Sequence, residues 1–189
     1  MDLNRLQKQC KKEMTFIINR YGDQRFLTNN IIAANVSEKA PTWSIDDFMT
    51  SAEIDPDERD DYLTDYAEYA ELDYKDTKQL EVLQYTINIK DTELQPLLTD
   101  DMQVLFADCA MLRIFKDDNK DFRVGNLNDK PVIFLTWFGK IIGILTPTAV
   151  NLRSVQKFAN ALVTGSRNSC RDGLYDVGGQ LSLLDGDDE

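Results

Sequence analysis

The chain has 189 residues, 42% of them hydrophobic, and a formal net charge of −12. This length and hydrophobic content are sufficient for a folded domain with a buried core. The negative charge would repel phosphate groups, which argues against direct binding to a nucleic-acid backbone, and it would attract basic partners.

The sequence contains no pattern typical of a membrane span or a signal peptide. The longest apolar run is interrupted at Gly139 and Lys140, and the N-terminal residues lack the apolar centre of a signal peptide. Cys10, Cys109 and Cys170 are widely separated and form no CxxC pair. These features indicate a protein of the reducing cytoplasm, and we expect no membrane partner.

Histidine is absent from the sequence, which excludes triads, zinc sites and acid–base chemistry that depend on histidine. An enzyme built on this chain would have to use carboxylates, lysine or a single cysteine. We therefore predict a non-enzymatic protein without a cofactor or a metal ion.

The N-terminal residues 2–21 have the pattern of an amphipathic helix. Asp2 is a suitable N-cap and Gly22 a suitable stop. Apolar residues recur between them at helical spacing, at Leu3, Leu6, Cys10, Met14, Ile17, Ile18 and Tyr21. We predict one long helix over residues 2–21.

Residues 46–76 are strongly acidic, because only Arg59 and Lys75 oppose thirteen Asp and Glu residues there. Asp55 followed by Pro56 is typical of a helix start, so we predict an acidic helix over residues 56–72. Helical spacing would place four carboxylates about 6 Å apart along one face, those of Asp57, Asp61, Asp65 and Glu68.

Residues 131–146 form the longest apolar stretch and predict a β-hairpin. The runs on both sides of Gly139 and Lys140 are rich in β-branched and aromatic residues, and this Gly-Lys pair suits a two-residue type II′ turn. A hairpin that is apolar on both faces is expected to lie at the centre of a sheet, covered on both sides.

The predicted fold class is α+β: a small antiparallel sheet centred on the 131–146 hairpin, flanked by helices over residues 2–21 and 149–163. The acidic helix over residues 56–72 would lie outside this core. The predicted domain covers residues 1–177, and residues 178–189, which begin with two glycines, are predicted to be a flexible tail.

The tail contains a short motif formed by Gln180, Leu181, Ser182, Leu183 and Leu184. This motif resembles the peptide with which many bacterial and phage proteins bind the replicative sliding clamp, except that Leu184 replaces the commoner phenylalanine. The resemblance implies that Gln180 hydrogen-bonds at the lip of the clamp pocket and that the last two leucines fill it. Two alternatives remain open: the leucines pack on the domain as an edge strand, or the tail has no partner.

The acidic segment resembles, in composition, the phage anti-restriction and anti-CRISPR proteins that act as DNA mimics. In that interpretation the carboxylates of Asp57, Asp61, Asp65 and Glu68 imitate phosphates and occupy a basic groove. The alternative is a solvated acidic helix without a partner.

Two further patterns match the letters of metal sites. Pro56-Asp57 and Asp73-Tyr74-Lys75 resemble the PD-(D/E)xK nuclease motif, but a helix between them would hold the two acids about 24 Å apart. Asp117 begins a segment like a calcium loop, but Phe122 stands where that loop requires glycine.

The preferred function is that of a non-enzymatic protein, encoded by a phage or mobile element, that binds bacterial DNA-processing machinery and inhibits or redirects it. The first alternative is an accessory protein of replication or repair that is tethered to the sliding clamp. The second alternative is a metal-dependent nuclease of the PD-(D/E)xK type. The predicted partner is a protein with a basic nucleic-acid groove, or the clamp itself.

Overall fold

The computed structural model describes residues 1–72, 74, 76–101, 103–116, 120–127 and 130–150, together with the backbone of residues 181–183. The chain divides into two compact units. Unit 1 comprises Met1–Leu80 and Met111–Thr146, and unit 2 comprises Glu81–Ala110 and Pro147–Glu189. The predicted α+β fold with a small antiparallel sheet is wrong, because the described chain is mostly β and unit 1 contains a large mixed sheet with few helices.

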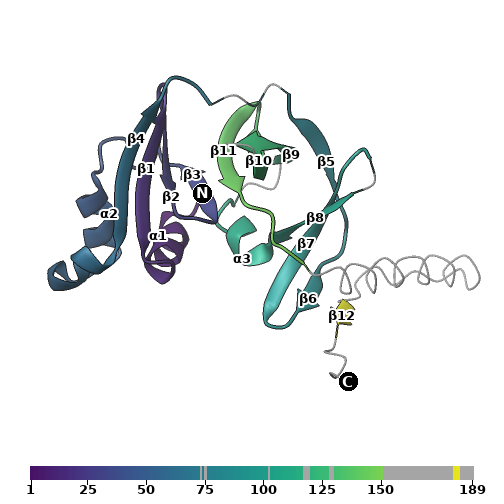
Figure 1. Cartoon of the computed structure of the whole chain (residues 1–189), viewed down its shortest axis with the longest axis horizontal. Helices are drawn as coiled ribbons and strands as arrows, with labels where there is room; N and C mark the ends of the chain where they lie inside the picture. The colour runs from purple at the N-terminus through teal and green to yellow at the C-terminus, as the bar shows by residue number, and fades with distance from the viewer. Residues whose placement is uncertain are drawn as a thin grey trace, which may run out of the picture. The chain divides into compact units, whose positions relative to one another are not determined.

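The sheet of unit 1 has the strand order β5-β9-β10-β11-β3-β2-β1-β4 (Figure 1). Neighbouring strands are antiparallel except β1 and β4, which run parallel. The strands are β1 (Thr15–Tyr21), β2 (Gln24–Thr28), β3 (Ile32–Asn35), β4 (Leu63–Tyr69), β5 (Lys78–Val82), β9 (Asp121–Leu127), β10 (Lys130–Trp137) and β11 (Lys140–Leu145). The helices are α1 (Leu3–Lys12), α2 (Ile45–Ser51) and the 3-10 helix η1 (Pro56–Asp61), and α3 (Cys109–Leu112) contains residues of both units.

The helix predicted over residues 2–21 is correct only in its first half. The side chain of Asp2 caps α1 by accepting a hydrogen bond from the backbone N–H of Arg5 at 3.2 Å. The helix ends at Lys12, and Met14 takes a left-handed backbone with φ 47°. The β-branched and aromatic residues that follow form β1, because they fit a sheet better than a helix.

The predicted central hairpin is confirmed, but its turn lies one residue earlier than predicted. β10 is buried from Val132 to Thr136, and it lies between β9 and β11. Trp137 pairs with Lys140, so the two-residue loop is Phe138-Gly139. Both loop residues have positive φ, 47° and 74°, as a type I′ turn requires, whereas type II′ places glycine first.

The hairpin supplies residues to the core of unit 1. One cluster of buried side chains joins β2, the segment after β4, and both hairpin strands, through Phe26, Leu72, Val132, Phe134, Ile141 and Ile144. The ring of Phe115 lies directly over Gly143, where an added Cβ would meet its Cζ at 2.2 Å. Glycine is therefore needed at this position for close packing.

Unit 2 contains β6 (Ile87–Ile89), β7 (Thr92–Leu98), β8 (Val104–Asp108) and the end of β5. β7 pairs in antiparallel fashion with β5, β6 and β8. Among the described residues of unit 2, Ile87, Leu94 and Phe106 form a cluster of buried side chains. The backbone of β12 (Leu181–Leu183) pairs in parallel with β6. The helix predicted over residues 149–163 lies almost entirely outside the described residues.

Candidate functional site

The acidic helix predicted over residues 56–72 is not formed. Asp55 caps η1, as its Asp-Pro sequence predicts, by accepting a hydrogen bond from the backbone N–H of Asp57 at 3.1 Å. The turn ends at Asp61, and Tyr62 is already extended, with φ −93° and ψ 138°. The next residue, Leu63, donates its backbone N–H to the carbonyl of Met14 at 2.9 Å and begins β4. Pairing with β1 thus decides the structure of this segment.

The four predicted binding carboxylates do not form one stripe. Asp57 and Asp61 lie on η1, whereas Asp65 and Glu68 lie on β4. Side chains alternate between the two faces of a strand, so Asp65 and Glu68, three residues apart, point to opposite faces of the sheet. All four are exposed. The structure therefore spreads these charges over the outer edge of unit 1.

Glu68 belongs to a polar cluster on the sheet face that also carries Phe16 and Ile18 of β1. Its carboxylate accepts a hydrogen bond from the hydroxyl of Tyr66 at 2.5 Å and lies 3.4 Å from the guanidinium of Arg20. These two contacts hold the pKa of Glu68 below its ordinary value, the Tyr66 hydroxyl having the larger effect. Glu68 therefore stays ionised at neutral pH.

The other face of β4 combines apolar side chains with Asp65. Leu63 is 55% exposed and Tyr69 46% exposed. The ring of Tyr69 stacks on Tyr21 with 4.7 Å between centroids. Exposed aromatic side chains held by a neighbour are typical of anchor residues in protein interfaces.

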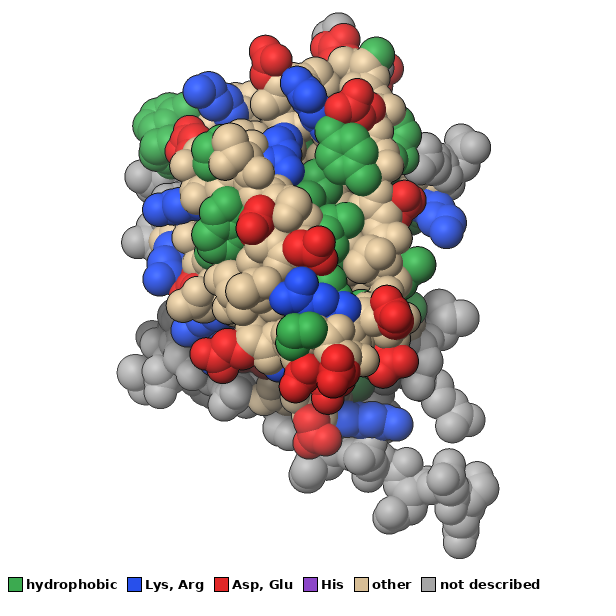
Figure 2. Space-filling model, turned by 90° about the vertical axis from the view of Figure 1, so that its left-hand side faces the viewer, with side chains coloured by type: hydrophobic (Ala, Val, Ile, Leu, Met, Phe, Trp, Pro, Cys, Tyr) green, Lys and Arg blue, Asp and Glu red, His purple; other side chains and the backbone are tan. Residues whose placement is uncertain are grey.

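We call the exposed carboxylates of α2, η1 and β4, with the Asp55 cap, the acidic edge. Figure 2 shows Asp and Glu side chains on the side of unit 1 that carries β4 and α2, with hydrophobic, Lys and Arg side chains among them. Arg59 is the only basic residue between positions 46 and 72. It lies 3.4 Å from Asp46 and donates a hydrogen bond to the Thr50 hydroxyl at 2.7 Å. The members of the acidic edge are Asp46, Asp47, Asp55, Asp57, Glu58, Asp60, Asp61, Asp65 and Glu68.

A cleft of about 540 Å³ opens on the acidic edge. Its walls come from α2 and the loop before it, from η1, and from the Tyr66 face of β4, and they include Trp43, Asp46, Arg59, Asp60 and Tyr66. The cleft therefore combines aromatic rings with the carboxylates of Asp46 and Asp60 and the guanidinium groups of Arg25 and Arg59. Carboxylates and aromatic faces both attract cationic side chains.

A second hollow, of about 240 Å³, lies on the opposite face of β1 and is lined in part by Asn19, Asn29 and Lys130. Asn29 is 5% exposed, and its Oδ1 accepts hydrogen bonds from the backbone N–H groups of Ile31 and Ile32. These bonds hold the loop between β2 and β3, whereas the buried Nδ2 of Asn29 has no hydrogen-bond partner among the described residues.

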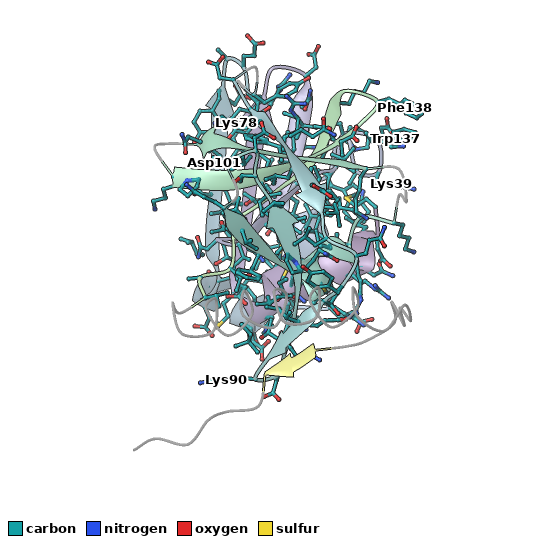
Figure 3. All side chains as sticks on the ribbon, turned by 90° about the vertical axis from the view of Figure 1, so that its right-hand side faces the viewer. Lys39, Lys78, Lys90, Asp101, Trp137 and Phe138 are labelled. Atoms are coloured by element: carbon teal, nitrogen blue, oxygen red, sulfur yellow. The ribbon has the colours of Figure 1, made fainter. Side chains whose placement is uncertain are left out.

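The tip of the central hairpin is a surface that sequence reasoning missed. Phe138 is 82% exposed and Trp137 40% exposed. Their rings pack together with 4.8 Å between centroids, and Figure 3 shows both at the end of the hairpin. The hydroxyl of Tyr74 donates to the carbonyl of Gly139 at 2.7 Å and fixes this tip. The signal in the sequence was an aromatic pair directly before a turn glycine.

The described residues contain neither a cluster of metal ligands nor an exposed thiol. No group of three or more Cys, Asp or Glu residues is placed there to hold a metal ion. Of the nuclease-like letters, Asp57 is exposed on η1, while Asp73 and Lys75 lie outside the described residues, as does the calcium-like segment from Asp117. Cys10 and Cys109 are buried, and burial raises the pKa of the Cys10 thiol to about 12.

The clamp-like motif lies outside the described residues, apart from the backbone of Leu181, Ser182 and Leu183 in β12. The described part of the chain includes no helix of the length and apolarity that a bilayer crossing demands. No protein-family model, curated protein sequence or solved structure matches this chain.

Proposed function

We propose that this protein is a non-enzymatic binding protein whose acidic edge engages a basic protein surface of the kind that holds a nucleic-acid backbone. The observation that carries the proposal is the density of exposed carboxylates on α2, η1 and β4. Arg59 is the one basic residue of α2, η1 and β4, and it already contacts the Asp46 carboxylate and the Thr50 hydroxyl. The edge therefore presents negative charge that its own residues leave largely unneutralised.

The chemistry of this surface suits a basic partner in two ways. Its carboxylates attract Lys and Arg side chains over distances of about 8–10 Å at physiological salt and guide their approach. Leu63, Tyr66 and Tyr69, each about half exposed on β4, supply apolar contact within the charged area. An interface of this kind gains orientation from charge and affinity from its aromatic anchors.

The proposal is tested with two variants that remove the same number of charges. The edge variant is Asp57→Asn, Asp61→Asn, Asp65→Asn and Glu68→Gln. The control variant removes four exposed carboxylates elsewhere, by Glu38→Gln, Asp91→Asn, Asp100→Asn and Asp121→Asn. The partner is isolated with the full chain from the source organism and purified, and its affinity for each variant is measured at two salt concentrations.

The edge variant is expected to bind about tenfold or more weakly, and to lose much of the salt dependence that the unmodified protein shows. The control variant should bind within about threefold of the unmodified protein, because its four charges are not part of the acidic edge and exposed charges without a direct contact are screened by salt. Equal weakening by both variants would show that only net charge matters and would contradict the proposal.

A competition experiment tests the nucleic-acid part of the proposal. Double-stranded DNA and this protein are expected to exclude each other from the purified partner. A ternary complex with undiminished affinities would contradict mimicry and leave a different basic surface as the target. Clamp binding through residues 180–184 stays a separate prediction, which deletion of residues 180–189 tests.

A further inference from the structure

The outermost strand of unit 1 offers a free edge. β4 is the last strand in the order of the sheet, and in the described part of the chain it pairs only with β1. It is seven residues long and exposed along its length except at Ala67, which is half-buried. An open strand of this length is a template for one more strand.

The register of the β1–β4 pair shows which backbone groups of β4 point outward. The N–H of Leu63 bonds to the carbonyl of Met14, and the carbonyl of Tyr69 accepts from the N–H of Gly22. In a parallel pair, alternate residues of a strand face the neighbour. The odd-numbered residues of β4 therefore face β1, and the backbone groups of Thr64, Tyr66 and Glu68 face away from the sheet.

One of these outward groups is capped within the chain. The Asp65 carboxylate accepts a hydrogen bond from the N–H of Tyr66 at 2.8 Å. This bond satisfies the middle donor of the edge and places a negative charge beside it. The N–H groups of Thr64 and Glu68 remain directed outward on either side, so the edge keeps donors and acceptors for an incoming strand.

The charges on β4 select the occupant. A second copy of this chain paired along the same edge would bring Asp65 and Glu68 of one molecule close to the same carboxylates of the other, and like charges across a sheet are destabilising. An extended segment that carries Lys or Arg avoids this repulsion. Its basic side chains would meet Asp65 on one face and Glu68 on the other, which corresponds to a spacing of three residues.

We infer that β4 binds an extended, basic segment of the partner as an added strand of the sheet. This inference rests on the proposed function, and it specifies how the acidic edge makes contact. The added strand bonds to the outward backbone groups of Thr64, Tyr66 and Glu68. Asp65 then exchanges its bond to the Tyr66 N–H for a basic side chain, and Leu63 and Tyr69 cover apolar residues of the segment.

The test uses a blocked peptide of about nine residues with lysine at every third position, separated by valine and threonine, so that lysines reach both faces. Amide hydrogen exchange of the full chain is measured by NMR with and without this peptide. Exchange at Thr64 and Glu68 is expected to slow about tenfold or more on binding, while the amides of Leu63, Asp65 and Ala67, already bonded to β1, change little.

Two variants of Thr64 separate strand pairing from charge. Thr64→Pro removes an outward N–H without changing the charge, and proline is tolerated where an edge N–H faces solvent. Thr64→Val keeps the N–H. The peptide is expected to bind Thr64→Pro about tenfold more weakly than Thr64→Val, which should match the unmodified protein.

The possible results separate strand addition at β4 from binding to the acidic edge by charge alone. Salt-sensitive binding that is equal for both Thr64 variants, without slowed exchange, would overturn strand addition and leave the acidic edge as a charged surface. Absence of peptide binding at low salt would overturn both. Slowing at Thr64 and Glu68 that grows with protein concentration, without peptide, would show pairing between copies and overturn the basic occupant. If Thr64→Pro does not fold, the exchange measurement on the unmodified protein still decides.

Discussion

Strands β10 and β4 belong to the same sheet but differ in almost every physical respect. β10 lies between two neighbours and is buried from Val132 to Thr136. β4 ends the sheet, and of its residues only Ala67 is even half-buried. The first strand holds the unit together, whereas the second carries the charged and aromatic side chains proposed to bind a partner.

This difference separates stability from function along one sheet. Burial of large apolar side chains makes β10 sensitive to any change of volume. Most side chains of β4 contribute little to folding, because surface positions away from special features tolerate substitution. Residues of β4 can therefore serve binding at little cost in stability.

Phe134→Ala in β10 is expected to have the largest effect. The ring is fully buried in the main cluster of unit 1, so its removal should lower the free energy of unfolding by about 3–5 kcal/mol. Tyr69→Ala in β4, at a 46% exposed ring, should cost about 1 kcal/mol or less. Urea unfolding of both variants checks the contrast, and equal losses would contradict it.

Gly143→Ala in β11 tests close packing at the same hairpin. The new methyl group would meet the ring of Phe115 at 2.2 Å, and overpacking of this kind costs about 1–3 kcal/mol. The second substitution Phe115→Leu should recover part of the loss. If Gly143→Ala unfolds at the same urea concentration as the unmodified protein, Phe115 does not lie over this glycine.

Ser44→Ala is expected to remove the cap of α2, which contributes to the acidic edge, at a cost of about 1 kcal/mol. Ser44 donates its backbone N–H to the Asp47 carboxylate at 2.7 Å and its hydroxyl at 2.8 Å. The backbone bond is the main reason that the pKa of Asp47 lies below its ordinary 3.8.

The lowered pKa of Asp47 fixes the sign of its pH dependence. Ionised Asp47 stabilises the folded state above pH 3.8, and this contribution is lost as the pH falls through the lowered pKa. Asp47→Asn should therefore flatten the decline in thermal stability as the pH falls from 3.8 through the lowered pKa. A decline as steep as that of the unmodified protein would contradict the role of the cap.

Glu68→Gln is expected to change stability least, because Glu68 and Arg20 form an exposed ion pair. Its binding to the basic partner should nevertheless weaken. Thermal unfolding and titration on the same sample separate the two effects. A large loss of stability with unchanged affinity would reverse the roles assigned to β4 and β10.

The sequence predicted what local chemistry determines. The Asp2 cap, the start of η1 after Asp55, and the buried hairpin at residues 131–146 all follow from short patterns. The type of turn was missed because both Gly139-Lys140 and Phe138-Gly139 satisfy a two-residue loop, and only the pairing of Trp137 with Lys140 decides between them.

The strand β4 could not be predicted because its structure depends on a distant partner. Its tyrosines and acids recur at spacings that fit a helix as well as a strand. Parallel pairing with β1, about fifty positions earlier in the chain, overrides that preference. The acidic composition of the edge was visible in the sequence, whereas the division of its carboxylates between η1 and the two faces of a strand was not.

The most direct test of the central claim is an NMR map of the full chain titrated with the lysine peptide described above. The largest shift changes are expected at β4 and η1, and they should disappear in the edge variant but persist in the matched control variant. Changes centred instead on the hairpin tip at Phe138 or on α1, and unaffected by loss of the edge carboxylates, would contradict the account.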